Sequence, residues 1–266
     1  MQFPDIDPVF LRLGALEFRW YGLMYIIGFV AAYFVINAEA QRRKVPLSRD
    51  DVADLIFAVA LGVILGGRLG YVLFYNLSEY VTHPLKIFTV WEGGMSFHGG
   101  LAGAILGGFW FARKKKIGYL SIADLCFLTA PIGLGLGRLG NFINGELYGR
   151  VTTAPWGMVF PDPRAGNLPR HPSQLYESFL EGPVIFSILW ILGRTKSPAG
   201  VISWAFIALY GTFRFIVEFF REPDFQLGFI VGSFSMGQLL SFPMALAGAV
   251  MVWRSYVREQ RQRDQR

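Results

Sequence analysis

Seven apolar stretches, each long enough to cross a lipid bilayer, constrain the fold of this chain more than any other feature of its sequence. The hydrocarbon core of a bilayer is roughly 30 Å thick, so a spanning helix needs about 20 mostly apolar residues. The composition agrees, because 53% of the 266 residues are hydrophobic and only 17% are charged. The sequence therefore predicts an all-α polytopic membrane protein with seven transmembrane helices. The predicted spans cover residues 20–37, 52–75, 96–112, 122–140, 175–192, 201–220 and 231–253.

Basic residues are concentrated in every second connection between these spans. They lie in residues 42–49, 113–116 and 194–196 and in the tail after Trp253, whereas the other connections hold few. Lys and Arg are retained on the cytoplasmic side during insertion, so their distribution sets the orientation. We therefore expect a periplasmic amino terminus and a cytoplasmic carboxyl terminus.

The whole chain, residues 1–266, is expected to form a single integral membrane domain. An irregular segment at about residues 141–172, which includes a stretch rich in Pro, Gly and Thr, is predicted to lie on the periplasmic side. Residues 1–18 lack the basic start and apolar run of a cleavable signal peptide. The first span is therefore expected to serve as its own insertion signal.

Several classes of partner and site are not expected. The net charge of +6 is explained by the basic inner loops, which also attract anionic membrane lipids, so no nucleic-acid partner is needed. The single cysteine, Cys126, excludes an intrachain disulfide and is expected to be a small buried residue. The three histidines have no HExxH or CxxC context, so neither a metal site nor a cofactor is expected.

Polar and charged residues inside the predicted spans lie near their outer ends. A charge at the centre of a membrane helix costs about 2.5–3.5 kcal/mol on insertion scales, so such residues are rare and usually face a cavity. The common depth of these residues predicts a polar site at the outer membrane boundary, although a single arginine among them can instead snorkel to lipid headgroups. They comprise Arg68, His98, Arg138, Asn141, Asn144, Arg214, Glu218 and Arg221.

Two patterns refine this polar site. Arg214, Glu218 and Arg221 follow an i, i+4, i+7 spacing, which places them on one face of a helix. That face either positions a guanidinium for an anionic ligand or forms a structural ion pair. The tetrad Gly-Arg-Leu-Gly occurs at residues 67–70 and again at 137–140. The two arginines could bind one phosphate together. The repeat is explained equally well if the two helices only share the same packing requirement.

Glycines recur at four-residue intervals in three predicted spans. Residues 135–140 match the dinucleotide pattern GxGxxG, but that pattern has meaning only between a strand and a helix of a βαβ unit. Close helix packing is the better interpretation, because small residues four apart allow two helix backbones to approach. The expected packing positions are Gly62, Gly66 and Gly70, Gly99, Gly103 and Gly107, and Gly133 and Gly137.

His98 lies in the segment GGMSFHGG at residues 93–100. Ser96 in this segment lacks the following glycine of a nucleophile elbow, so a serine hydrolase is not expected. With a reference pKa near 6.5, a histidine is suited to proton transfer at neutral pH. His98 either acts as a base or hydrogen-bonds a neighbour, and its sequence context leaves both roles open.

Five longer motifs together resemble the prolipoprotein diacylglyceryl transferases of bacteria, over nearly the whole chain. They are MSFHGG at 95–100, GRLGNFINGELYGR at 137–150, HPSQLYE at 171–177, RFIVEFFREPD at 214–224 and SMGQLLS at 235–241. The resemblance implies a multi-pass enzyme of the bacterial inner membrane. Such an enzyme transfers diacylglyceryl from phosphatidylglycerol to the lipobox cysteine in the signal peptide of a preprolipoprotein and releases glycerol 1-phosphate.

The resemblance also implies roles for individual residues by motif position. Arg138 and Arg214 are similar to the essential arginines of the family, and His98 to its motif histidine. Asn141, Glu146 and Gly149 belong to its signature.

A mechanism follows as a hypothesis from this implied reaction. Negative charge grows on the leaving phosphate, and planar guanidinium groups suit it, so Arg138 and Arg214 are the expected phosphate clamp. A free thiol is only a few per cent ionised at pH 7, so either His98 acts as its base or the arginines lower the thiol pKa. Glu218 and Glu146 are expected to orient the arginines, and Asn141 and Asn144 to bind the glycerol headgroup.

The outer surroundings of the site carry further expectations. Tyr21 and Tyr148 line the headgroup pocket or serve as interfacial anchors, and residues 150–172 cap the substrate routes or form a passive loop. The full set assigned to substrate binding is Arg138, Asn141, Asn144, Glu146, Gly149, Tyr21, Arg68, Glu218 and Arg221.

Two other classes of protein remain in competition with an enzyme. A transporter of an anionic substrate also places charges inside a helix bundle, but its pathway needs polar groups that reach the inner side. The inner halves of the predicted spans offer little beyond Asp124. A non-catalytic lipid-binding scaffold is the other alternative, and it has no need of a base beside an arginine clamp.

Overall fold

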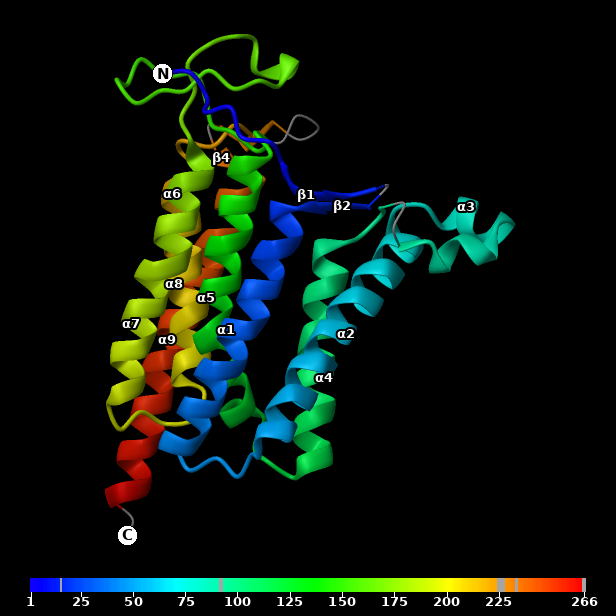
Figure 1. The fold of residues 1–266 in the computed structure, drawn as a ribbon. Helices are drawn as coiled ribbons and strands as arrows, with labels where there is room; N and C mark the ends of the chain where they lie inside the picture. Colours follow the sequence, from blue (N-terminus) through cyan, green and yellow to red (C-terminus); the bar gives the residue numbers. More distant parts are fainter. Residues whose placement is uncertain (15, 91–92, 224–227, 233, 265–266) are drawn as a thin grey trace. The chain divides into compact units, whose positions relative to one another are not determined.

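The computed structural model describes residues 1–14, 16–90, 93–223, 228–232 and 234–264, and most of them are helical (Figure 1). The chain forms two compact units. The first comprises residues 1–32 and 126–266, and the second comprises residues 33–125. Two long helices, α1 (Trp20–Arg42) and α5 (Tyr119–Ile143), contribute residues to both units.

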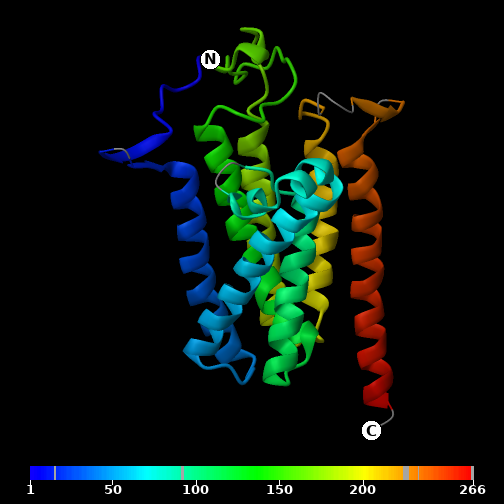
Figure 2. The ribbon, with the colours of Figure 1, turned by 90° about the vertical axis from the view of Figure 1, so that its right-hand side faces the viewer.

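In the first unit, α8 (Val201–Val217) packs along α9 (Met236–Asp264), as the yellow and red helices of Figure 2 show. Two glycines permit this contact. A Cβ at Gly211 would lie 2.7 Å from the backbone nitrogen of Ala245, and one at Gly248 would lie 2.7 Å from the carbonyl oxygen of Trp204. The seam between these two helices therefore depends on close backbone approach.

A kinked helical segment also packs against α8 in this unit. It consists of α6 (Ser173–Phe179), a π-helical turn η4 (Leu180–Val184) and α7 (Ile185–Arg194). Pro183 has no N–H to continue the helical hydrogen bonds, and Gly182 leaves helical geometry at φ −89° and ψ −105°. The kink therefore has an identifiable cause in the sequence.

The irregular segment after α5 is held by its own small core. Phe3, Phe142 and Phe160 pack together, and Gln2 pairs with Val159 as an isolated bridge. A short 3-10 helix, η3 (Pro163–Ala165), lies inside the segment. Two antiparallel hairpins complete the unit, formed by β1 (Val9–Leu13) with β2 (Leu16–Arg19) and by β3 (Phe229–Val231) with β4 (Phe234–Ser235).

In the second unit, α2 (Arg49–Phe74) packs against α4 (Phe97–Lys115), with α3 (Leu77–Thr82) and a 3-10 helix η1 (Pro84–Phe88) between them in the chain. A capping box between Ser48 and Asp51 starts α2. The Gly62, Gly66 and Gly70 row meets the Gly99, Gly103 and Gly107 row, and a Cβ at Gly70 would lie 2.9 Å from the Cα of Gly99. The predicted packing at these two rows is confirmed.

The third predicted packing pair is confirmed only at Gly133, since a Cβ at Gly28 of α1 would lie 3.5 Å from the Gly133 Cα. A Cβ at Gly133 or Gly137 would meet nothing within 4 Å. Gly135, which lies between these two glycines in the sequence, makes a closer backbone contact: a Cβ there would lie 2.9 Å from the Cα of Gly182. Four-residue spacing identified the right helix but not the face that packs on the kinked segment.

A group of charges in the second unit lies at the basic end of α1. Glu39 is ion-paired with Arg42 and Arg43, and the Arg43 Nη1 atom lies 3.6 Å from Asp124. Both carboxylates are buried. The inner polar group that the sequence suggested at Asp124 is therefore compensated by an arginine.

Among the described residues, five helices are long and apolar enough to cross a membrane: α1, α2, α5, the continuous segment Ser173–Arg194 and α9. The apolar helix α8 is shorter, and the glycine-rich α4 has 19 residues. A mostly helical protein with several helices long and apolar enough to span a membrane is confirmed, whereas seven crossings and the orientation stay predictions. The boundaries differ at α1, which ends at Arg42, and at α9, which begins only at Met236.

The glycine seam of the second unit generates a direct test. Gly103→Ala places a Cβ against the carbonyl of Gly62, so we expect it to destabilise the protein by about 1–3 kcal/mol, the usual cost of overpacking. Gly108→Ala is the matched control, because its Cβ would meet only the Val59 Cγ2 atom at 3.9 Å and the Tyr119 Cε2 atom at 4.0 Å. Thermal unfolding in detergent measures both, and equal melting temperatures would contradict the seam.

Candidate functional site

A buried carboxylate from α6 lies among three arginines in the first unit. The Glu177 Oε2 atom is 2.6 Å from the Arg138 Nε and 3.3 Å from the Arg214 Nη1. The Oε1 atom of the same group accepts a hydrogen bond of 3.1 Å from Arg221. With Glu181 and Glu218, these residues form what we name the arginine–glutamate cluster: Arg138, Glu177, Glu181, Arg214, Glu218 and Arg221.

The α8 side of the cluster is held by the start of α9. The Arg214 Nη2 atom lies 2.9 Å from the Glu218 Oε2, and the Oε1 of Glu218 accepts a hydrogen bond of 3.1 Å from the Ser235 hydroxyl. A Cβ at Gly237 would lie 2.6 Å from the Glu218 carboxyl carbon. The SMGQ segment therefore both binds Glu218 and leaves room for it.

The α5 side of the cluster depends on the kink at Gly182. Gly135 and Gly182 are in backbone contact, and the Ser178 hydroxyl donates to the Gly135 carbonyl at 2.8 Å. Arg138 lies three residues after Gly135, about one helical turn along the same face of α5. Because α5 and the kinked segment are close at Gly135, the Arg138 Nε lies 3.6 Å from the Glu181 Oε2.

The cluster suits an anionic ligand as well as internal pairing. The side chains of Arg138 and Arg214 are 19% and 14% exposed, so each is accessible on part of its surface. Arg138 meets the carboxylates through Nε, and among the described residues none accepts a hydrogen bond from its two terminal nitrogens. A planar guanidinium with two open donors matches the geometry of a phosphate or carboxylate.

The last turn of α5 and the turn after it hold Asn141 and Asn144. Asn141 and Asn144 both donate to the Glu146 Oε1 atom, at 2.9 and 3.1 Å. Gln174 from α6 donates to the Glu146 carbonyl at 2.6 Å. Arg138 was expected to be oriented by Glu146, but its partners are Glu177 and Glu181. Glu218, the other carboxylate expected to orient an arginine, does contact Arg214.

Two further predicted residues act through packing. The Tyr21 ring packs against Gly140, where a Cβ would be 2.7 Å from the ring, and its hydroxyl is 3.1 Å from that of Tyr25. Gly149 joins the irregular segment to the end of α8, because its N–H donates to His171 at 2.8 Å and it bridges to Arg221. A side chain at Gly149 would overlap neighbouring backbone, so this position requires glycine.

The irregular segment after α5 also holds Tyr148 and His171. Tyr148 packs on Phe160 and under the Arg170 guanidinium, and burial raises the pKa of its hydroxyl. Burial lowers the pKa of His171, whose Nδ1 lies 3.1 Å from the Tyr176 hydroxyl. Both aromatic side chains therefore help to pack this segment.

Arg68 belongs to the second unit and has a different environment from Arg138. Its guanidinium is buried and donates to the carbonyls of Ile87 at 2.8 Å and Gly93 at 2.5 Å, and also to Lys86. The two Gly-Arg-Leu-Gly arginines thus differ, since one binds main-chain carbonyls and the other binds carboxylates. Arg68 fixes the connection between α2 and α4.

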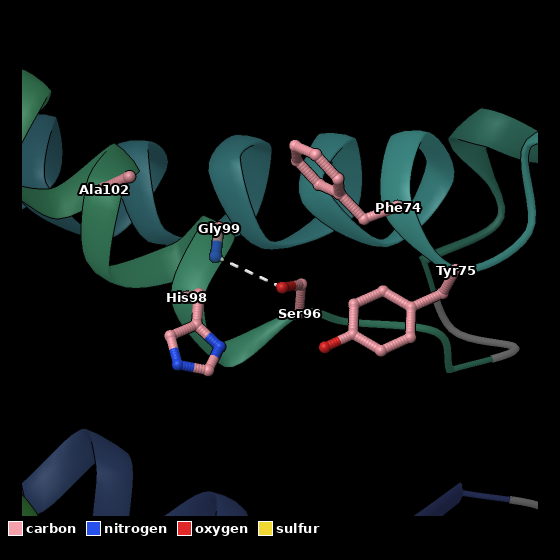
Figure 3. A pocket seen from close by; sticks show the side chains of 6 residues that line it. All are labelled: Phe74, Tyr75, Ser96, His98, Gly99 and Ala102. Atoms are coloured by element: carbon pink, nitrogen blue, oxygen red, sulfur yellow. Dashed lines mark hydrogen bonds between the residues drawn. The ribbon is translucent and has the colours of Figure 1, made fainter. Parts of the chain in front are cut away.

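His98 is the second residue of α4 and lines a pocket of about 460 Å³ in the second unit. Ser96 caps the helix by accepting the Gly99 N–H at 3.2 Å. Figure 3 shows the His98 ring and the Tyr75 hydroxyl on the same side of this pocket. His98 is exposed, as a proton-transfer group must be to meet its substrate. Its convergence with the arginines stays a prediction.

The sequence reasoning missed Glu177 and Glu181 as site residues. Glu177 ended a quoted motif, and the two carboxylates are four residues apart within a predicted span. Two acidic residues at that spacing inside an apolar helix share one face and need cationic partners, a signal equal to the one that singled out Arg214 and Glu218.

Comparisons with known proteins identify similar chains. The family model for prolipoprotein diacylglyceryl transferase matches residues 8–254. A phosphatidylglycerol–prolipoprotein diacylglyceryl transferase of Geobacter sulfurreducens is 69% identical over 251 residues, 94% of this chain and 96% of the relative. The enzymes of the same name from Vibrio cholerae and Photobacterium profundum are both 53% identical, over 97% and 96% of this chain and 94% and 96% of their own lengths.

The central carboxylate generates the second test. Glu177→Gln removes the charge shared by three arginines, and we expect a loss of about 3–5 kcal/mol in unfolding free energy, as for other broken buried ion pairs. The control is Glu222→Gln, which breaks a partly exposed pair with Arg170 and should cost at most about 1 kcal/mol. Unfolding by detergent titration measures both, and a smaller loss for Glu177 than for Glu222 would refute its central place.

Proposed function

Because the chain belongs to the prolipoprotein diacylglyceryl transferase family, we propose that it transfers diacylglyceryl from phosphatidylglycerol to the lipobox cysteine of a preprolipoprotein. The second product is glycerol 1-phosphate, and the reaction is the first step of bacterial lipoprotein maturation. The observation that carries this proposal is the arginine–glutamate cluster, which supplies guanidinium donors to an anion inside a helix bundle. The relatives carry the same proposed substrates in their names.

We place the protein in the bacterial inner membrane with seven crossings, a periplasmic amino terminus and a cytoplasmic carboxyl terminus. The basic connections support this orientation, because they fall on one side. In this arrangement the cluster lies toward the outer leaflet, where the lipid headgroup and a translocated signal peptide meet. The lipid enters sideways from the bilayer.

The reaction forms a carbon–sulfur bond and breaks a carbon–oxygen bond. The thiolate of the substrate attacks the glycerol carbon of the diacylglyceryl group, and the phosphate ester leaves with the electron pair of the broken bond. Charge on the phosphate rises during this step, so donors fixed in advance stabilise the transition state more than the bound lipid. Arg138 and Arg214 supply these donors, while Glu177 and Glu218 position them.

The remaining groups recognise the headgroup and the thiol. The amide nitrogens of Asn141 and Asn144 are used by Glu146, which leaves their oxygens to accept the glycerol hydroxyls. His98 is the base that takes the thiol proton. In the alternative, the positive charge of the arginines lowers the thiol pKa, and no histidine is needed to remove the proton.

A transporter and a lipid-binding scaffold each explain fewer features of the arginine–glutamate cluster than an enzyme does. A transport pathway needs open polar groups toward the inner side, whereas Glu39 and Asp124 are both ion-paired there. A scaffold does not need partly open donors on Arg138. An assay of the purified protein with phosphatidylglycerol and a lipobox peptide separates the three, since only the enzyme adds the mass of diacylglyceryl to the peptide.

The clamp gives the third test. Arg138→Ala is expected to lower the rate of adduct formation at least 10²–10³-fold, the usual cost of losing one donor to a developing charge. Arg164→Ala is the control, because Arg164 is exposed in the outer loop and pairs only locally with Asp162. Mass spectrometry of the peptide follows the rate, and near-normal turnover by the folded Arg138 variant would eliminate the clamp.

The base gives the fourth test. His98→Gln is expected to reduce turnover by about 10²–10⁴-fold, the typical contribution of a general base, and to move the acid-side fall in rate to higher pH, because the substrate thiol must then ionise without a base. His83→Gln is the control, since His83 is exposed in the same unit and contacts Glu79 and Thr82. An unchanged pH profile for His98→Gln would favour ionisation of the thiol by the arginines.

A further inference from the structure

Glu181 is the least compensated carboxylate of the arginine–glutamate cluster. Its side chain is 0% exposed, and neither carboxylate oxygen has a hydrogen-bond partner among the described residues. The ion-pair contact of Glu181 is the 3.6 Å approach of the Arg138 Nε, which is 1 Å longer than the contact of that nitrogen with Glu177. A buried carboxylate with so little compensation is costly in its charged form.

The kinked segment keeps Glu181 in this position. Glu181 lies in the π-helical turn, next to Gly182, and the contact of Gly182 with Gly135 fixes its distance from α5. The charged and titratable groups that act on it come from every neighbouring element. They are Arg138 on α5, Glu177 on α6, Tyr210 and Arg214 on α8, and Arg221 beyond the end of α8.

The charges of the cluster balance when all of its groups are ionised. It contains three guanidinium groups and three carboxylates, so its net charge is zero. Arg150 and Glu146, on the loop side, add one charge of each sign. The phosphate of phosphatidylglycerol is a diester with one negative charge, and a neutral cluster compensates it poorly in a medium of low dielectric.

Protonation of one carboxylate removes this mismatch. The candidates are Glu177, Glu218 and Glu181, but Glu177 contacts three arginines and Glu218 contacts Arg214 and Ser235. Each of these two carboxylates has one oxygen that accepts a hydrogen bond and is ion-paired with arginine at 3.3 Å or closer. Glu181 has no comparable set of contacts among the described residues.

We propose that Glu181 takes up a proton when phosphatidylglycerol binds, so that the cluster presents one net positive charge to the lipid phosphate. The proton comes from the solvent, and no bond of the lipid changes in this step. Protonation also releases the Arg138 Nε from its second carboxylate. Glu181 touches Arg138 rather than the substrate and is therefore a positioning residue, and the proposal rests on the proposed function of the site.

Calorimetry of lipid binding tests this inference without the transfer reaction. Short-chain phosphatidylglycerol is titrated into the detergent-purified protein, without peptide, in pairs of buffers that differ in ionisation enthalpy, from pH 6 to pH 9. We expect wild-type protein to take up as much as one proton per lipid bound within this range. At a pH where one proton is taken up, the affinity for the lipid should fall about tenfold for each unit by which the pH rises, because proton uptake and lipid binding are linked.

Glu181→Gln fixes the neutral state of this side chain. We expect it to bind the lipid without proton uptake and with an affinity independent of pH, whereas Glu181→Asp restores the uptake. Glu222→Gln and His171→Gln are controls, a carboxylate and a histidine outside the cluster, and both should behave as wild type. Undiminished proton uptake in Glu181→Gln would overturn the proposal.

The wild-type protein alone also decides the question, in case Glu181→Gln does not fold. Lipid binding with no proton uptake anywhere between pH 6 and pH 9 would refute the role of Glu181. The same preparation is then assayed with a lipobox peptide. Transfer activity without proton uptake would refute only this inference, while proton-coupled lipid binding without transfer would refute only the proposed enzymatic function.

Discussion

The ion pairs of Glu177 with three arginines are the interaction on which the rest of the site depends. Each arginine would be costly to bury alone, because removing a charge from water is repaid only by close and well-oriented partners. Glu177 supplies that partner from α6 to Arg138 on α5, Arg214 on α8 and Arg221 beyond it. One carboxylate thereby fixes the relative positions of three segments that are distant in sequence, and it leaves guanidinium nitrogens for an anion.

Glycine makes this arrangement possible at specific contacts. Gly135 and Gly182 bring α5 to the kinked segment, Gly149 brings the irregular segment after α5 to the end of α8, and Gly237 leaves space for the Glu218 carboxyl group. In each case a Cβ would lie within 3 Å of a neighbouring atom. The glycine-rich composition of the motifs is therefore explained by packing around charged groups, and it does not indicate a nucleotide-binding loop.

The sequence predicted the helices well because apolar length and basic flanks are local signals. The glycine rows of α2 and α4 were also predictable, since their spacing is regular over several turns. The face of α5 that packs on the kinked segment was not predictable, because Gly133, Gly135 and Gly137 have similar spacings and only the kink at Gly182 selects Gly135. A π-helical turn has no comparably simple sequence signal.

The site was predicted in its cationic half and missed in its anionic half. Arg138 and Arg214 stood out because arginine is rare inside a span, and the structure brings both to one carboxylate. That carboxylate, Glu177, was overlooked because its partners lie on other helices and pairing between helices cannot be deduced from spacing along one of them. The repeated Gly-Arg-Leu-Gly tetrad was ambiguous for the same reason, since the partners of Arg68 are the carbonyls of a loop.

The central claim is that Arg138 and Arg214 hold the phosphate of the lipid. The most direct measurement is the dipolar coupling between the phosphorus of phosphatidylglycerol and ¹⁵N-labelled arginine side chains, by solid-state NMR of the protein in bilayers. We predict dephasing that corresponds to a phosphorus–nitrogen distance of roughly 4 Å, the value for a charge-assisted hydrogen bond to a phosphate oxygen. This signal should disappear when both arginines are replaced by unlabelled lysine, and its absence in the active wild-type protein would contradict the account.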